Sequence, residues 1–345
     1  MTTTNIWGNV LRGVAFGDAW GDPNEFDSIT RLLKENNGLG PDLPAKLRIT
    51  DDTQMTLYLA KALNDSWGQD PDQVRAAIRK EFLTYARDPQ NFRAPGTTVM
   101  GSLGRLRSGA HWHRTTNRGS DGSGSVMRTS PCAFLPEDRW VGITAYAAAL
   151  THGNANSIAA AILNVAMLRL LIQNRINPAA GHLLEVARQH AVNPELHGLM
   201  DTGDWLEGFE VDLTKGFANL VELIDLALAK LPELQENPWA GRKSDPSLVV
   251  ADSEWRGGGW RGPEALVIAM LAIDMFPGDE WLALRRSVVT DGDSDTIGAV
   301  AGGLIGAMEP DTFMFAWKED ASRFEDIYQE WIEQADSYAM AGVTV

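Results

Sequence analysis

The sequence Arg48-Ile49-Thr50-Asp51-Asp52-Thr53-Gln54-Met55-Thr56 runs directly into a segment whose apolar residues recur at three- and four-residue spacing through Leu63. This spacing predicts a helix and places Asp51 and Asp52 in its first turn. Asp51 with Gln54 has the form of a capping box, and acids at this end also offset the helix dipole. Adjacent carboxylates repel each other unless a cation lies between them, so a divalent metal site is a second interpretation. This stretch alone leaves both interpretations open.

Helical periodicity recurs along most of the chain, without an alternating strand pattern or a repeat of fixed length. Turn residues such as Gly40-Pro41-Asp42 separate the periodic segments, and no long low-complexity linker divides the chain. We therefore predict a single all-α domain, a compact helical bundle over residues 1–345. The predicted helices are 5–20, 53–65, 72–86, 140–150, 157–172, 179–190, 216–231, 264–275 and 322–336.

Composition narrows the class of protein. With 44% hydrophobic and 22% charged residues, the chain has the make-up of a soluble globular protein. Its net charge of -16 leaves no basic surplus for phosphates and argues against a nucleic-acid partner. The single cysteine, Cys132, excludes an intramolecular disulfide and a cysteine-rich zinc site. The N-terminus lacks the pattern of a signal peptide, and the longest apolar candidate, residues 297–308, is too short for a bilayer. We expect a cytoplasmic protein without membrane contact.

A second acid cluster lies late in the chain, at Asp291-Gly292-Asp293-Ser294-Asp295-Thr296. It superficially resembles a calcium loop, but Gly302 occupies the position where a twelve-residue loop needs glutamate. The small residues that follow instead predict a helix that packs tightly in the core. Two acid clusters, each opening a helix, predict a site where carboxylates and hydroxyls converge on two hard cations.

Several other motifs have a structural and a functional interpretation. Gly13, Gly17 and Gly21 line one side of a helix and permit close backbone approach, and Glu25 follows on a loop that a ligand can reach. The Gly/Ser segment 119–125 is either a surface loop or a phosphate-binding loop, although it lacks the lysine of nucleotide hydrolases.

Four further side chains are each open to two interpretations. His111 and His113 are either exposed or metal ligands, and His152 at a helix junction is more often structural than catalytic. Trp260, on a glycine-rich loop, either stacks on a base or sugar or fills a gap between helices.

Taken in order, these motifs resemble the ADP-ribosylglycohydrolase family, which includes the dinitrogenase reductase-activating glycohydrolase and the vertebrate ADP-ribosyl-arginine hydrolases. The resemblance covers about residues 8 to 308. Its matching segments are Gly17-Asp18-Ala19 with Pro23 and Glu25, Thr50-Asp51-Asp52-Thr53, Gly122-Ser123-Gly124-Ser125-Val126-Met127-Arg128, Thr151-His152, Gly257 to Trp260, and Asp293-Ser294-Asp295-Thr296.

The resemblance implies an all-α fold and a metal-dependent hydrolase that removes ADP-ribose from a modified side chain, with arginine favoured. The partner would be an ADP-ribosylated protein or an ADP-ribosyl small molecule, and Glu25 would be the catalytic residue near the scissile bond. The ligands of two divalent ions, Mg²⁺ or Mn²⁺, would be Thr50, Asp51, Asp52, Asp293, Asp295 and Thr296. The substrate-binding residues would be Gly122, Ser123, Gly124, Ser125, Met127, His152, Gly258 and Trp260, the last near the adenosine.

Two positions depart from the family pattern. Ser123 stands where the family commonly has asparagine and shortens a polar reach into the pocket, and Asp291 stands where it commonly has glycine and is expected to add charge beside the metals. These departures leave the attached group open: arginine, serine, another nucleophile or a free metabolite. The alternative is a catalytically silent relative that binds ADP-ribose or serves a structural role. The enzyme is favoured because all six metal positions and Glu25 carry competent residues.

Overall fold

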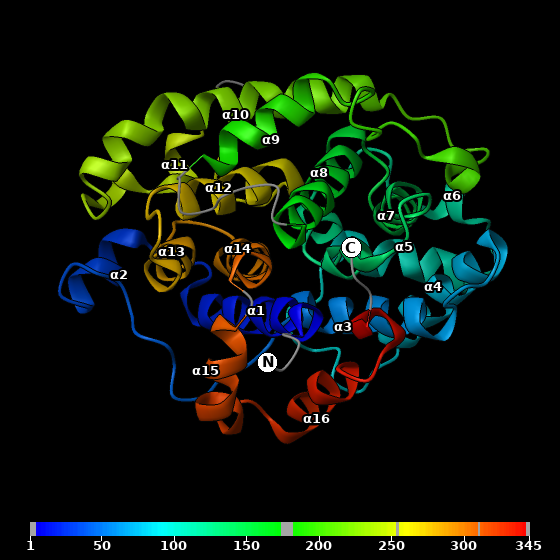
Figure 1. Ribbon diagram of the computed structural model, residues 1–345, viewed down its shortest axis with the longest axis horizontal. Helices are drawn as coiled ribbons and strands as arrows, with labels where there is room; N and C mark the ends of the chain where they lie inside the picture. The colour runs from blue at the N-terminus through cyan, green and yellow to red at the C-terminus, as the bar shows by residue number, and fades with distance from the viewer. Residues whose placement is uncertain (1–4, 174–181, 253–254, 310, 343–345) are drawn as a thin grey trace.

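The computed structural model describes residues 5–173, 182–252, 255–309 and 311–342. These residues form helices joined by short loops, and their only β-pairing consists of isolated bridges at Leu47–Phe324, Asn117–His152 and Gly122–Arg261. The predicted all-α class is therefore confirmed. Figure 1 shows α10 along one side of the fold and α15 and α16 along the opposite side, with α1, α12 and α14 between them.

The α-helices are α1 (Ile6–Gly21), α2 (Ile29–Glu35), α3 (Asp51–Asp65), α4 (Pro71–Tyr85), α5 (Thr97–Arg107), α6 (Trp112–Thr115), α7 (Trp140–Ala149), α8 (Ala155–Ile172), α9 (Leu183–Val192), α10 (Leu213–Glu236), α11 (Pro246–Val249), α12 (Gly262–Asp274), α13 (Glu280–Ser287), α14 (Ser294–Met308), α15 (Thr312–Asp320) and α16 (Asp326–Ala335). Short 3-10 turns that bear on the site are η1 (Asp22–Asn24), η2 (Ser123–Ser125) and η6 (Gly241–Ser244).

Helices α1 and α14 lie near the centre of the fold (Figure 1) and make the most extensive helix–helix contact among the described residues. Gly13 meets Gly302 and Gly17 meets Gly298, so the two helices run antiparallel. A Cβ placed on Gly17 would lie 1.9 Å from the Gly298 carbonyl oxygen, and one on Gly13 would lie 2.1 Å from the Gly302 carbonyl oxygen. No side chain fits at such distances, so glycine is required on both helices. The glycine spacing that predicted close backbone approach in α1 thus finds its partner in α14. This contact brings the end of α1 next to the acidic start of α14.

The longest apolar run belongs to α8 rather than to residues 297–308. Among the described residues, α8 is the one helix that is long and apolar enough to cross a membrane by length and composition. However, 89% of this apolar stretch is buried inside the protein, as expected of a core helix. Its buried Arg169 donates to the carbonyl oxygens of Ala133 (2.9 Å) and Leu135 (2.7 Å), so a charged residue interrupts the apolar run without ending the helix.

Most predicted helices are present, with differences at their ends. The prediction 179–190 starts outside the described residues, and its remainder lies in α9. The prediction 216–231 ends too early, because α10 continues through Pro232 and buries Leu234 on the same face. The prediction 322–336 begins too early. Phe324 lies in extended backbone and packs its ring against Phe16, so this apolar residue belongs to a loop and not to the helix that follows. The short helices α2, α5, α13 and α15 were not predicted.

Candidate active site

One cleft of about 350 Å³ brings most of the predicted site residues together. This volume lies in the range of small-molecule pockets. The predicted residues on its wall are Glu25, Asp51, Asp52, Gly122, Ser123, Gly124, Met127, His152, Trp260, Asp293, Asp295 and Thr296. Thr50, Ser125 and Gly258 are buried and do not form part of the wall. The sequence reasoning missed the rest of the lining, which is Phe26 and the segment 94–99 that leads into α5.

The start of α3 is capped by residues other than the paired acids. Asp18 of α1 accepts hydrogen bonds from the backbone N–H groups of Thr50 and Thr53, each at 3.0 Å. Thr50 is the N-cap, and its Oγ1 accepts from the N–H of Asp52 at 3.3 Å. Because Asp18 and Thr50 satisfy this helix end, the Asp51 and Asp52 side chains are not needed as caps.

The capping box predicted from Asp51 and Gln54 does not form. Asp51 is already the first residue of α3, and Gln54 donates to a tyrosine hydroxyl 2.6 Å away. The Asp51 Oδ2 instead accepts from the N–H of Gly96 at 3.1 Å, which ties the segment before α5 to the cleft. Asp52 Oδ1 is buried and has no hydrogen-bond partner among the described residues. An unpaired buried carboxylate oxygen is costly unless a cation or a proton joins it.

At the start of α14 a second group of carboxylates faces the first. Oxygen atoms of Glu25, Asp293 and Asp295 all lie within 4.8 Å of one another, and they form the one group of this kind among the described residues that could hold a metal ion. The Asp293 N–H donates to the Gly258 carbonyl oxygen at 2.7 Å, so the glycine loop before α12 positions this turn. Gly258 therefore contacts the acidic turn through its backbone.

Burial, and then mutual repulsion, raises the pKa values of the carboxylates in and around the cleft. Burial, together with repulsion from Asp295 and then Asp51, raises the pKa of Glu25 to about 8. Burial, and then the charge of Asp295, raises the pKa of Asp18 to about 7. The pKa of Asp52 and that of Asp293 are also raised well above the ordinary value, first by burial and then by Asp295.

These observations fit a hard divalent cation. The donors are all carboxylate and hydroxyl oxygens, which Mg²⁺ and Mn²⁺ prefer. The Asp52 oxygen that lacks a hydrogen-bond partner is free to bind a cation, and a bound cation would remove the repulsion that raises these pKa values. The site is therefore well suited to metal ions.

The Gly/Ser loop packs directly on His152. A Cβ on Gly124 would lie 2.9 Å from His152 Cε1, and one on Gly122 would lie 3.2 Å from His152 Nε2. Ser125 is buried, and its hydroxyl donates to the Gly122 carbonyl oxygen at 3.0 Å, so it shapes the loop from within. The backbone N–H of Ser123 donates to the Trp260 carbonyl oxygen at 3.0 Å, and this contact fastens the loop to the segment before α12.

His152 is a neutral hydrogen-bonding group. Arg128 Nη2 donates to Thr151 Oγ1 at 2.6 Å, which leaves the Thr151 hydroxyl hydrogen for His152 Nδ1 at 2.8 Å. We therefore assign the imidazole hydrogen to Nε2. Burial, and then the charge of Arg128, lowers the pKa of His152 well below its ordinary value. Because His152 lines the cleft, it offers an N–H donor there.

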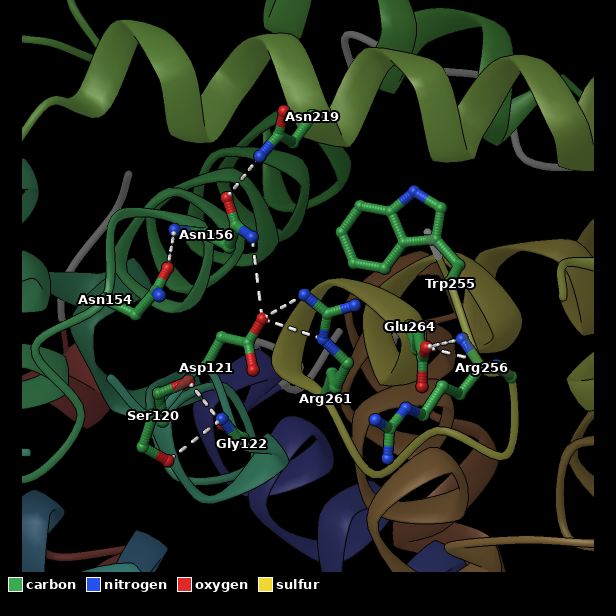
Figure 2. A network of polar contacts seen from close by, with 12 residues as sticks. Ser120, Asp121, Gly122, Asn154, Asn156, Asn219, Trp255, Arg256, Arg261 and Glu264 are labelled. Atoms are coloured by element: carbon green, nitrogen blue, oxygen red, sulfur yellow. Dashed lines mark hydrogen bonds and ion pairs between the residues drawn. The ribbon is translucent and has the colours of Figure 1, made fainter. Parts of the chain in front are cut away.

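Figure 2 shows the polar network that holds the Gly/Ser loop from outside the cleft. Asp121 Oδ2 accepts from Arg261 Nε at 2.7 Å and from Asn156 Nδ2 of α8 at 3.5 Å. Asn156 Oδ1 in turn accepts from Asn219 of α10 at 2.9 Å. Glu264 Oε1, at the start of α12, accepts from two backbone N–H groups of the glycine loop. The network thus anchors the Gly/Ser loop and the glycine loop before α12 to the helices α8, α10 and α12.

Trp260 does not fill a gap between helices. Its side chain is 43% exposed and stacks on Phe26, which is 77% exposed, with ring centroids 5.2 Å apart and ring planes inclined by 23°. Both rings line the cleft, and Phe26 directly follows Glu25. The stacked pair therefore forms a part of the rim that no pattern in the sequence predicted.

Two further expectations are settled by position. The rings of His111 and His113 lie against each other, with centroids 4.1 Å apart and planes inclined by 44°. Both residues lie outside the cleft, and among the described residues neither belongs to a group of three side chains that could hold a metal ion. Asp291 does not add charge beside the acid cluster as expected. Its carboxylate pairs with Arg242 and accepts from the N–H of Ile29, so it faces α2.

A family model, a curated relative and a solved structure each resemble this chain over most of its length. The family model for ADP-ribosylglycohydrolase matches residues 8–342. The uncharacterised protein YegU of Escherichia coli (strain K12) is 27% identical over 328 residues, covering 89% of this chain and 88% of that protein. An uncharacterised protein of Archaeoglobus fulgidus is 29% identical over 133 residues, covering 37% of this chain and 42% of that protein. A solved structure named ADP-ribosylglycohydrolase-related protein complex has the same fold, with a TM-score of 0.60 at 22% identity over 98% of this chain and 96% of that chain.

Proposed function

This chain belongs to the ADP-ribosylglycohydrolase family, and we propose that it is a metal-dependent hydrolase that cleaves the glycosidic bond between ADP-ribose and an arginine side chain of a modified protein. It would thereby reverse ADP-ribosylation, and we place it in the cytoplasm. The observation that carries the proposal is the acid-lined cleft, where Glu25, Asp293 and Asp295 lie within 4.8 Å of one another beside the Gly/Ser loop.

The proposed cofactors are two divalent ions, Mg²⁺ or Mn²⁺. Their ligands would be Thr50, Asp51, Asp52, Asp293, Asp295 and Thr296. When bound, such ions would orient ribose hydroxyls and a water molecule. The buried carboxylates supply the opposite charge and the hard oxygen donors that hold ions of this type.

The substrate would lie along the Gly/Ser loop. Gly122, Ser123, Gly124 and Met127 line the cleft, and the small residues there would allow a phosphate to approach the loop backbone closely. His152 would donate its Nε2 hydrogen to the ligand. Trp260 would contact the adenosine half, with its exposed ring as the stacking surface.

Glu25 is proposed as the proton-transfer group. Cleavage at the anomeric carbon builds positive, oxocarbenium-like charge on the ribose, and it requires a proton for the leaving group and a base for the incoming water. Burial, the largest cause, raises the pKa of Glu25 above that of an ordinary glutamate, which favours the protonated form that gives a proton to the leaving group. The resulting carboxylate accepts a proton from water in the following step, which restores the starting state.

The proposal is tested by comparing linkages. The purified protein is incubated with an ADP-ribosylated arginine peptide and an ADP-ribosylated serine peptide, each with Mg²⁺, with Mn²⁺ or with chelator, and released ADP-ribose is measured. We expect release from the arginine peptide only when a metal is present. Release from the serine peptide alone would mean that the protein is an ADP-ribosyl hydrolase whose substrate linkage is to serine and not to arginine. Binding of ADP-ribose without release from either peptide would identify a silent relative instead.

A further inference from the structure

Asp291 connects the acidic turn before α14 to the start of α2. Its Oδ1 accepts a hydrogen bond from the N–H of Ile29, the first residue of α2, at 2.6 Å. Its Oδ2 forms an ion pair with Arg242 Nη1 at 2.5 Å. The Asp291 side chain is 11% exposed, whereas that of Arg242 is 61% exposed. The Asp291 carboxylate is therefore largely buried. Its hydrogen bond to Ile29 is shielded from solvent, whereas its ion pair with Arg242 is exposed.

This contact lies at one end of the segment that carries Glu25. At the other end, Asn24 Nδ2 donates to the carbonyl oxygens of Trp20 at 3.1 Å and Val288 at 3.0 Å. Glu25 and Phe26 lie between the two anchors. The segment is thus fastened to α1 and α13 before Glu25 and to the acidic turn after it.

The segment needs such anchors for two physical reasons. Phe26 has a φ of 63°, in the left-handed region, which is a strained conformation for a residue with a Cβ. A turn in this conformation persists only where flanking contacts determine it. In addition, the Glu25 carboxylate is repelled by its acidic neighbours Asp293 and Asp295, and Glu25 is only partly buried, so solvent is open to it.

We propose that Asp291 is a positioning residue for Glu25. By holding the N–H of Ile29, it fixes the start of α2 and keeps Glu25 beside Asp293 and Asp295. The inference rests on the proposed function to the extent that Glu25 transfers protons.

The test compares Asp291→Ala with Asp291→Asn in the full-length, Mn²⁺-loaded protein. Asparagine keeps an oxygen that can accept from Ile29 and loses only the charge, so it is the conservative rescue. The matched control is Asp121→Asn, which weakens a different aspartate–arginine pair, one whose carboxylate is 17% exposed and which holds the Gly/Ser loop (Figure 2). Hydrogen exchange of the peptide 22–35 is measured by mass spectrometry, and kcat and KM are measured with ADP-ribosyl-arginine.

We expect Asp291→Ala to speed exchange in 22–35 and to lower kcat by about tenfold or more, with KM within about twofold, because a buried bond to a charged acceptor is lost. Asp291→Asn should restore both values to near wild type. Asp121→Asn should leave exchange in 22–35 unchanged and should raise KM instead. If alanine prevents folding, Asp291→Gly takes its place.

Unchanged exchange in Asp291→Ala would show that no anchor exists. Faster exchange with a wild-type kcat would show an anchor that does not position Glu25, and it would also overturn the inference. If the wild-type protein releases no ADP-ribose from any substrate, the proposed function fails, and hydrogen exchange alone then decides whether Asp291 holds the segment.

Discussion

Glu25 follows the end of α1 and Asp295 lies in the first turn of α14, yet their carboxylate oxygens lie within 4.8 Å of each other. This proximity arises from the glycine contact between the two helices, since Gly21 meets the backbone of Ser294 and Asp295 without a side chain between them. The packing of two small-residue helices therefore sets the geometry of the candidate active site.

Adding a side chain at the glycine contact between α1 and α14 should destabilise the whole domain. A Cβ on Gly298 would lie 2.3 Å from the Gly17 carbonyl oxygen, so Gly298→Ala forces the helices apart, and we expect it to lower the free energy of unfolding by about 1–3 kcal/mol. The matched control is Gly104→Ala in α5, where an added Cβ meets nothing within 4 Å; it should be neutral or stabilising by about 0.5–1 kcal/mol. Urea unfolding measures both. Equal stability of the two variants would contradict the packing account.

Divalent ions should raise the melting temperature by binding the folded state alone. Asp52→Ala and Asp295→Ala should each remove most of this shift. The two aspartates come from acid clusters far apart in the sequence, and both clusters contribute ligands to one metal site. The control Asp72→Ala removes an 89% exposed carboxylate of α4 and should keep the full shift. Differential scanning fluorimetry with Mn²⁺ measures it. A full shift in either cluster variant would mean that the two ends do not share a metal site.

The metal-free protein should become less stable as pH rises. In the folded state Glu25 has a pKa of about 8 and Asp18 a pKa of about 7. In the unfolded state both carboxyl groups lose their protons at a much lower pH. Between those limits the folded state holds more protons than the unfolded state, so the free energy of unfolding falls as pH rises from about 5 to 8. Divalent ions should flatten this dependence and release protons on binding. Calorimetry in buffers of different ionisation enthalpy detects the release, and its absence would show that the cluster is already ionised.

Removing the exposed ring at the rim should weaken ligand binding. Base–aromatic stacking contributes about 1–3 kcal/mol, so Trp260→Ala should weaken ADP-ribose binding by about tenfold or more. Phe26 stacks on Trp260 and adjoins Glu25, so Phe26→Ala serves as the comparison. Isothermal titration calorimetry with ADP-ribose measures both. If Trp260→Ala leaves ADP-ribose affinity unchanged but raises KM for the arginine substrate, the ring contacts the leaving group rather than the adenosine.

Periodic features were predictable from the sequence because they depend on local spacing. The helices with a continuous apolar face, such as α3 and α12, fall where predicted, and the spacing of Gly13, Gly17 and Gly21 correctly indicated a close helix contact. Convergence of the two acid clusters followed from their chemistry rather than from periodicity. The eight-residue helix α13 escaped prediction because too few turns contribute to a periodic signal.

Other contacts between distant segments were not predictable. That Asp18 of α1 caps α3, and that Asp291 turns toward Ile29 instead of the acid cluster, depends on how two distant segments meet. The same holds for the Phe26–Trp260 stack. In each case the side chain has several suitable partners in the chain, and only the three-dimensional fold selects one of them.

The most direct test of the account is the turnover of Glu25→Gln with an ADP-ribosylated arginine peptide and Mn²⁺, measured together with Mn²⁺ and ADP-ribose affinity. Glutamine keeps the size and polarity of the side chain but does not transfer protons. The account predicts that kcat falls by about 10²–10⁴-fold while both affinities stay close to wild type. A wild-type kcat, or a loss of Mn²⁺ binding that would make Glu25 a metal ligand, would contradict it.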